Sequence, residues 1–252
     1  MSIKPLLVTP ITGASIAAGL KTQKRAMVEC KQYRLGGKKG AIPTTANFVG
    51  IKCGKFTWED GDDIYSIAPP YQAGDILYVR EPARKVLVAV RPGCGELLDG
   101  WQYAGDGSIM LSTGAKVRPS ELSRIYDVKE WIPATNVPKT AVRQFLEVVN
   151  VEVERLHDIS KGDISMEGVP ATYPMSPLFC SYCGGTGRED TGVRCPLCDT
   201  PKKRFANYWR EKMAHKCNPD TDWARNPWVW KITYKLTSNL KLNRSGEWVV
   251  PV

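Results

Sequence analysis

The sequence predicts an α+β protein with a small β-barrel at its centre, and three features of the chain support this. Short apolar runs bounded by glycine and proline recur along the 252 residues, as expected for a sheet of short strands. Two segments, 12–24 and 205–214, show the spacing of helices with one apolar face. Within residues 71–81, the apolar run 76–79 follows a turn signal and suits a strand covered on both faces, as in a barrel wall.

The remaining elements follow from the residue pattern in chain order. Ile16, Ala17 and Leu20 give the first helix its apolar stripe. Segment 145–155 is the longest predicted strand, because its valines alternate with polar residues. Residues 91–128 contain several glycines and are predicted to form an irregular insertion. The other predicted elements are a hairpin over 48–58, an acidic turn over 59–63, a strand over 85–90, a short helix over 156–168 and a final strand over 228–234.

Composition narrows the class of protein. The net charge is +9, from 35 basic and 26 acidic residues, which favours polyanions such as RNA or DNA as partners. No apolar run is long enough to cross a bilayer, so no membrane partner is expected. The first ten residues are too short and too interrupted for a secretion signal, and we therefore expect a cytoplasmic protein.

Charged and aromatic residues near these elements each have two interpretations. Lys21, Lys24 and Arg25 form a solvated turn, or Lys21 turns inward to a pocket while Lys24 and Arg25 meet phosphates. Glu81 follows Arg80 at the end of a strand, so its carboxylate pairs with Arg80 or lines a cavity. Four aromatic residues near basic ones are candidates either for base stacking or for core packing: Trp101, Tyr103, Trp131 and Trp228.

Half of the eight cysteines form two Cys-x-x-Cys pairs, Cys180 with Cys183 and Cys195 with Cys198. Eleven residues separate the pairs, and two such turns can converge into a closed tetrahedral site for structural Zn²⁺. An iron–sulfur cluster and a redox pair of thiols are the alternatives. The glycine pattern of residues 180–187 resembles a half-repeat of the zinc region of DnaJ-type chaperones, which favours the metal.

Several segments, taken in order, resemble the ASCH domains of phage and prophage proteins, which are relatives of the PUA-like β-barrels. Each segment is short, and the specificity comes from their order along most of the chain. The matching segments are 19–25, 72–81, 103–107, 129–133, 136–138, Arg143, 153–156, 158–160 and 226–230.

The resemblance implies a small barrel with flanking helices and a cleft that holds RNA or a nucleobase. Some members of the superfamily are hydrolases of N4-acylated cytidines, whose site combines a lysine, a threonine three positions later and a glutamate. Lys21 and Glu81 match the lysine and the glutamate, whereas Lys24 stands in place of the threonine. The resemblance also makes three further basic residues candidates for ligand contacts: Arg80, Lys139 and Arg143.

These observations predict four parts of the chain and leave three functional hypotheses. The first is binding of RNA, DNA or a modified nucleotide, and the second is an N4-acylcytidine hydrolase or a ribonuclease centred on Lys21 and Glu81. The third is an accessory module that binds a protein through the zinc segment. The predicted parts are a barrel over 1–177, a zinc-ribbon or knuckle insert over 178–204, a helix and strand completing the barrel over 205–236, and a basic tail over 237–252.

Overall fold

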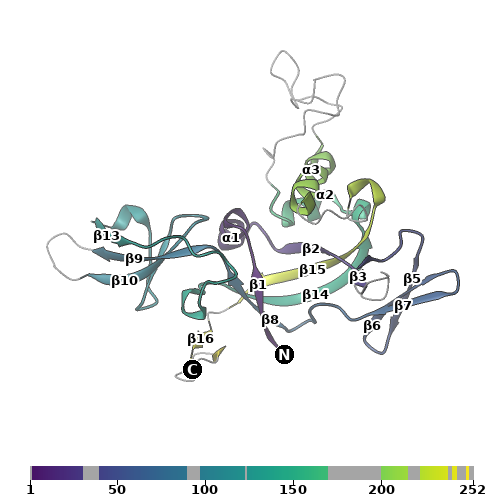
Figure 1. The fold of residues 1–252 in the computed structure, drawn as a ribbon, viewed down its shortest axis with the longest axis horizontal. Helices are drawn as coiled ribbons and strands as arrows, with labels where there is room; N and C mark the ends of the chain where they lie inside the picture. The colour runs from purple at the N-terminus through teal and green to yellow at the C-terminus, as the bar shows by residue number, and fades with distance from the viewer. Residues whose placement is uncertain are drawn as a thin grey trace, which may run out of the picture. The chain divides into compact units, whose positions relative to one another are not determined.

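The computed structural model is mostly β-sheet with a few short helices, and its chain divides into two compact units (Figure 1). Unit 1 comprises Met1–Lys21, Ala73–Val149 and Tyr234–Val252, and unit 2 comprises Thr22–Gln72 and Asn150–Thr233. The predicted α+β class is therefore confirmed, whereas no sheet among the described residues closes into a barrel. The structure describes residues 2–30, 40–89, 97–122, 124–169, 200–214, 222–237, 240–242 and 248–249.

In unit 1, strand β8 (Ile76–Arg80) lies between two partners. β1 (Ile3–Leu7) pairs parallel with it, and the first residues of β14 (Phe145–Arg155) pair antiparallel with it. Leu77 and Val79 are buried, at 1% and 2% exposure. The apolar run predicted to be a two-sided strand is thus a strand paired on both sides, as its composition requires.

Helix α1 (Pro10–Ala17) follows β1 in unit 1. Thr9 caps its start, because the Thr9 hydroxyl accepts a hydrogen bond from the backbone N–H of Thr12. The helix ends well before Lys24, since Gly19 takes a φ of 70° that a helix cannot continue. The predicted helix over 12–24 is therefore too long.

Residues predicted to be an irregular insertion form most of a second sheet in unit 1, with the order β12-β11-β10-β9-β13. Its buried face packs Val86 and Val88 against Ile109 and Leu111. The prediction was wrong because these strands are short and contain glycine. The strands are β9 (Ala83–Ala89), β10 (Leu98–Tyr103), β11 (Ile109–Leu111), β12 (Lys116–Val117) and β13 (Arg124–Val128).

Unit 2 contains a three-stranded antiparallel sheet of β5 (Asn47–Lys52), β6 (Lys55–Asp60) and β7 (Asp63–Ile67). Cys53 and Gly54 form the two-residue turn between β5 and β6, and both have positive φ, as a tight hairpin turn requires. The hairpin predicted over 48–58 is confirmed.

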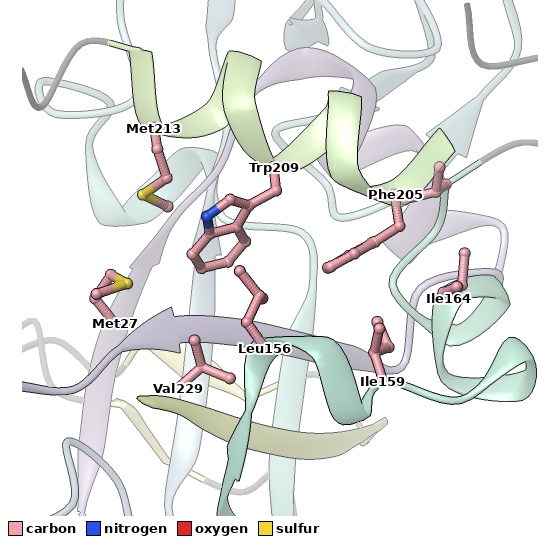
Figure 2. Packing of buried hydrophobic residues seen from close by; sticks show 9 residues of the cluster. Met27, Leu156, Ile159, Ile164, Phe205, Trp209, Met213 and Val229 are labelled. Carbon is pink, nitrogen blue, oxygen red and sulfur yellow. The ribbon is translucent and has the colours of Figure 1, made fainter. Parts of the chain in front are cut away.

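A second part of unit 2 packs helices against strands, as Figure 2 shows. α3 (Pro201–Met213) turns Phe205, Trp209 and Met213 towards a cluster of apolar side chains. The partners come from β2 (Gln23–Met27), β15 (Trp228–Leu236) and α2 (Lys161–Met166), together with Leu156, Ile159 and Val169. The predicted amphipathic helix is confirmed by this packing.

β14 and β15 contribute residues to both units. Within unit 2, β15 pairs antiparallel with β2, so that Lys231 stands opposite Arg25. The remaining elements are β3 (Glu29–Cys30), β4 (Gly40–Ala41), β16 (Lys241–Leu242) and β17 (Trp248–Val249), with single 3₁₀ turns at Pro119–Glu121, Lys139–Ala141, Leu156–Asp158 and Trp223–Arg225.

Candidate functional site

Glu81 and Arg143 form a buried ion pair in unit 1. Glu81 follows β8 directly and its side chain is 2% exposed, and Arg143 precedes β14 with 5% exposure. Arg143 Nε donates to Glu81 Oε1 at 2.8 Å, and Arg143 Nη2 donates to Glu81 Oε2 at 2.9 Å. This is the two-point geometry that fits guanidinium to carboxylate best. Glu81 therefore pairs with an arginine 62 residues away and not with its neighbour Arg80.

The same guanidinium also binds a turn that follows β10. Arg143 Nη1 donates to both carboxylate oxygens of Asp106, at 2.9 and 3.1 Å, and to the Ser108 hydroxyl. The Tyr103 ring lies 3.9 Å from Arg143 Cζ, within the range of a cation–π contact. All three nitrogens of Arg143 are thus engaged, and the cluster joins the start of β14 to the turn predicted over 103–107.

Burial and charge oppose each other in this cluster. Burial raises the pKa of Asp106, but hydrogen bonds from Arg143 and Ser108 outweigh it and the pKa is lowered. Burial lowers the pKa of Arg143, yet hydrogen bonds and charge from Glu81 and Asp106 raise it overall. Burial raises the pKa of Tyr103. The cluster therefore holds Arg143 and Asp106 charged and Tyr103 neutral at physiological pH.

Gln144 connects the ion pair to helix α1. Its Nε2 donates to Glu81 Oε1 at 3.0 Å and to the Gly13 carbonyl at 3.3 Å, and these two acceptors fix the orientation of the amide. Gln144 Oε1 is buried and has no hydrogen-bond partner among the described residues. A Cβ at Gly13 would lie 2.3 Å from Glu81 Oε2, so glycine is required there. The helix therefore lies directly against the carboxylate.

Three other predicted contact residues lie in unit 1. Lys21 follows α1 and is 5% exposed, and its backbone N–H donates to the Ser15 carbonyl at 3.2 Å. Arg80 donates from Nη2 to the carbonyls of Thr135 and Val137, so it secures a loop. Lys139 is exposed in the 3₁₀ turn before Arg143.

Lys24 and Arg25 lie on strand β2 of unit 2, not on a helix. The Arg25 side chain is fully buried. Its Nε donates to Glu154 at 2.6 Å, and its Nη2 and Nη1 lie 3.3 Å from Asp163 and 3.5 Å from Glu167. In this structure the Arg25 charge is therefore met by carboxylates in the core and does not face a surface where a phosphate would bind.

The four aromatic candidates for stacking fall into different environments. Tyr103 is buried at 1% exposure, and Trp228 packs against Trp58 while Arg155 covers its ring at 4.3 Å. Trp101 packs against the cluster around Tyr103. Trp131 is 45% exposed. Of the four, Trp131 is the one that the structure presents to solvent as a stacking surface.

Sequence reasoning missed Asp106 and Gln144 as members of the cluster around Glu81. Asp106 lies inside segment 103–107, which already belonged to the set resembling ASCH domains, so its position was available as a signal. Gln144 follows Arg143 directly, and a polar pair at the start of an apolar strand is a pattern that could have indicated it. The partners themselves depend on the tertiary fold.

The predicted zinc ligands Cys180, Cys183, Cys195 and Cys198 lie outside the described residues. Within the described ranges, no group of three or more His, Cys, Asp or Glu residues is arranged to hold a metal ion. No helix in the described part of the chain has the length and hydropathy needed to cross a membrane. No family model, curated protein or solved structure matches this chain.

Proposed function

We propose that this protein binds RNA, DNA or a modified nucleotide, and that the polar cluster of Glu81, Arg143 and Gln144, together with Lys21 of the same unit, forms the core of its ligand site. The proposal includes the ASCH relationship, with the strands of unit 1 corresponding to part of a PUA-like barrel wall. It also includes a phage or prophage origin and action in a bacterial host cytoplasm.

The observation that carries the proposal is the buried, hydrogen-bonded pair of Glu81 and Arg143. Gln144 donates to Glu81, and its side-chain oxygen is a buried acceptor without a partner among the described residues. Burying an ion pair is costly and contributes little to stability compared with apolar packing, so such pairs cluster at functional sites. Gln144 Oε1 is a buried acceptor that no donor in the described part of the chain reaches. An exocyclic amino group of a nucleobase is a donor of the kind that this oxygen would accept.

The net charge of the chain supports a polyanionic ligand. With 35 basic and 26 acidic residues, the protein attracts phosphate backbones at moderate ionic strength. This attraction is independent of base identity, whereas the cluster around Glu81 would supply selectivity for a base. The two contributions predict salt-sensitive binding with a salt-insensitive preference among nucleosides.

Binding of labelled 12-nucleotide RNA and DNA, single-stranded and duplex, tests the proposal. We expect affinity to fall about tenfold or more between 50 and 200 mM salt, because several phosphates exchange counterions for protein charges. Gln144→Met should reduce the preference among ribonucleosides measured by competition, while Lys116→Met on β12 serves as an exposed control. Absence of binding to every probe at 50 mM salt would overturn the proposal.

Hydrolysis of an N4-acylated cytidine, or of RNA, is a second candidate function, and one observation favours it. Lys21 and Glu81 are both at least nine-tenths buried in the same unit, as a catalytic lysine and carboxylate would be. Both Glu81 oxygens already accept hydrogen bonds from Arg143, so a reacting water would have to share them. Release of acetate from N4-acetylcytidine, abolished in Lys21→Ala, would establish hydrolysis of the acylated nucleoside. Its absence would set aside that substrate, and cleavage of RNA would then be tested separately.

Structural Zn²⁺ bound by Cys180, Cys183, Cys195 and Cys198 is the metal component of the proposal. A closed four-thiolate site has no open coordination position, so the metal would stabilise its segment and take no part in chemistry. Elemental analysis of purified protein should find one zinc per chain, and Cys183→Ser should lose it. Iron in place of zinc would indicate the cluster alternative.

A further inference from the structure

Strand β13 of unit 1 and the segment that follows it expose three large side chains with apolar surface. It is the terminal strand of its sheet among the described residues. Tyr126 is 53% exposed, Val128 is 42% exposed and Trp131 is 45% exposed, all within six residues. Single exposed apolar side chains are common, but three large ones within a short stretch, two on β13 and one just beyond it, are a candidate interaction surface.

Each of the two aromatic rings has an arginine guanidinium against it. Arg124 Cζ lies 5.1 Å from the centroid of Tyr126, and Arg84 Cζ lies 4.5 Å from that of Trp131. Gln102 Oε1 accepts from Arg84 Nε at 2.8 Å, which fixes the Arg84 side chain. Cationic and aromatic groups are therefore held together at two points, one on β13 and one between β9 and the segment that follows β13.

A β-bulge sets the position of Tyr126. Ile125 stands opposite Val88 and Asp127 stands opposite the adjacent Leu87, so Tyr126 is an extra residue in the ladder. Bulges at the edge of a sheet redirect a side chain away from the regular alternation and are frequent at functional surfaces. The bulge thus gives a reason for the exposure of Tyr126 that is independent of its residue type.

We propose that this surface, defined by Arg84, Arg124, Tyr126 and Trp131, is a platform for single-stranded nucleic acid, on which bases stack on the two rings and the arginines meet phosphates. The inference rests on the proposed nucleic-acid binding and adds the surface and the form of the nucleic acid. It also assigns a role to Arg124 and Tyr126, which lie in the segment 91–128 predicted to be an irregular insertion.

Stacking chemistry favours a single strand over a duplex. Bases of a single strand can separate and lie flat on aromatic rings, whereas bases in a duplex are already stacked on each other. Tyr126 and Trp131 are five residues apart in the chain, so their backbones are separated by at most about 16 Å. Two rings at this separation would contact bases that are several nucleotides apart.

Charge at the platform is positive but moderate. Lys129 Nζ lies 2.8 Å from Asp127, so this pair is neutral together. Glu130 is exposed on the same segment and reduces the local positive potential. Stacking on the rings, more than phosphate attraction, should therefore supply the affinity of this surface.

The test measures binding of a fluorescein-labelled 12-nucleotide RNA of mixed sequence, and of a duplex of the same length, to the full chain. Tyr126→Ala and Trp131→Ala should each weaken single-strand binding by about 5- to 100-fold, the range for loss of one stacked base. Tyr126→Phe and Trp131→Phe retain a ring and should bind within about threefold of wild type. Duplex binding should change by less than threefold in all four variants.

Two outcomes separate this inference from the function on which it rests. If wild type binds single-stranded RNA and the alanine variants bind equally well, the platform is wrong while nucleic-acid binding stands. If wild type binds no nucleic acid, both are wrong, and an added peptide strand on β13 becomes the occupant to examine. Because both rings are exposed, unchanged thermal unfolding of the variants would exclude misfolding as the cause of any loss.

Discussion

Each compact unit buries one arginine among carboxylates, and the two arginines are held in different ways. Every nitrogen of the Arg143 guanidinium in unit 1 donates a hydrogen bond. Arg25 in unit 2 donates from Nε to Glu154, but its Nη2 lies 3.3 Å from Asp163 without hydrogen-bond geometry. In unit 1 the Arg143 charge is therefore met by hydrogen bonds from all three nitrogens. In unit 2 the Arg25 charge depends more on the nearby negative charges of the carboxylates.

The charge balance also differs. Arg143 faces two carboxylates, whereas Arg25 faces three, with Lys231 Nζ 3.3 Å from Asp163 as a second cation. Burial raises the pKa of Glu154 even though Arg25 lowers it. Two arginines that are buried to a similar extent can therefore differ in how far the stability around them depends on the protonation of neighbouring carboxylates.

The largest expected effect is that of Arg143→Met. The change leaves Glu81 buried without the two hydrogen bonds and the opposite charge that Arg143 supplies, and we expect the free energy of unfolding to fall by about 4 kcal/mol. Urea unfolding at pH 7 measures it, with Arg118→Met at an exposed side chain as the control. A loss below about 1 kcal/mol would contradict the description of the Glu81 cluster as a satisfied buried pair.

Arg25→Met should cost about 3 kcal/mol at pH 8 and less at pH 5. The raised pKa of Glu154 means that the folded protein takes up a proton there more readily than the unfolded chain does. Stability from this group is therefore lost as pH rises and recovered as pH falls. Urea unfolding at both pH values measures this loss in the free energy of unfolding. An equal loss at pH 5 and pH 8 would contradict the proposed difference in charge balance between the two units.

Gly13→Ala tests how tightly α1 packs on Glu81. The added Cβ would lie 2.3 Å from Glu81 Oε2, so helix or carboxylate must move, at about 2 kcal/mol. Gly162→Ala in α2 is the matched control, because its nearest neighbour would be 3.7 Å away. That variant should be neutral or up to about 1 kcal/mol more stable. If Gly13→Ala and Gly162→Ala changed the thermal unfolding temperature equally, the Glu81 side chain would be able to move away from the added Cβ at little cost.

The smallest effect concerns Asp106, which is partly exposed. Its folded-state pKa is lowered below 3.8 because hydrogen bonds from Arg143 and Ser108 outweigh burial. A lowered carboxyl pKa contributes stability that is present above the unfolded value and lost as pH falls through the folded one. Asp106→Asn should therefore cost at most about 1 kcal/mol at pH 6 and nothing once wild-type Asp106 is protonated. A difference that does not shrink as pH falls through the acid range would contradict this linkage.

The sequence predicted the long and strongly patterned elements of the fold. The strand over 145–155, the hairpin at Gly54 and the amphipathic helix before Met213 each carry a period or turn signal that their own residues determine. The sheet containing β10 to β13 was missed because strands of two to six residues carry too little pattern. Its existence depends on pairing between segments, which local sequence does not encode.

The residues of the candidate site were predicted, but the contact between Glu81 and Arg143 was not. Lys21 and Glu81 were predicted together as the centre of a site and Arg143 as a ligand contact, and the fold brings Glu81 and Arg143 into direct contact. The partner expected for Glu81 was its chain neighbour Arg80, since adjacency is the cue that sequence offers. Arg25 was expected at a phosphate and is instead buried in the core, because a charged residue on a strand gives no indication of the carboxylates that will surround it.

The parallel pairing of β1 with β8 has a consequence for synthesis of the chain. Ile3 pairs with Ile76 and Leu7 with Arg80, so a ribosome must deliver about 70 further residues before β1 finds its partner. β8 in turn gains its second neighbour only when Phe145 to Glu147 have emerged. Closing such long loops is slow. The nascent chain therefore carries an apolar strand with an unpaired edge for much of its translation. Chaperones that bind extended apolar segments have the most time to bind the chain at this strand.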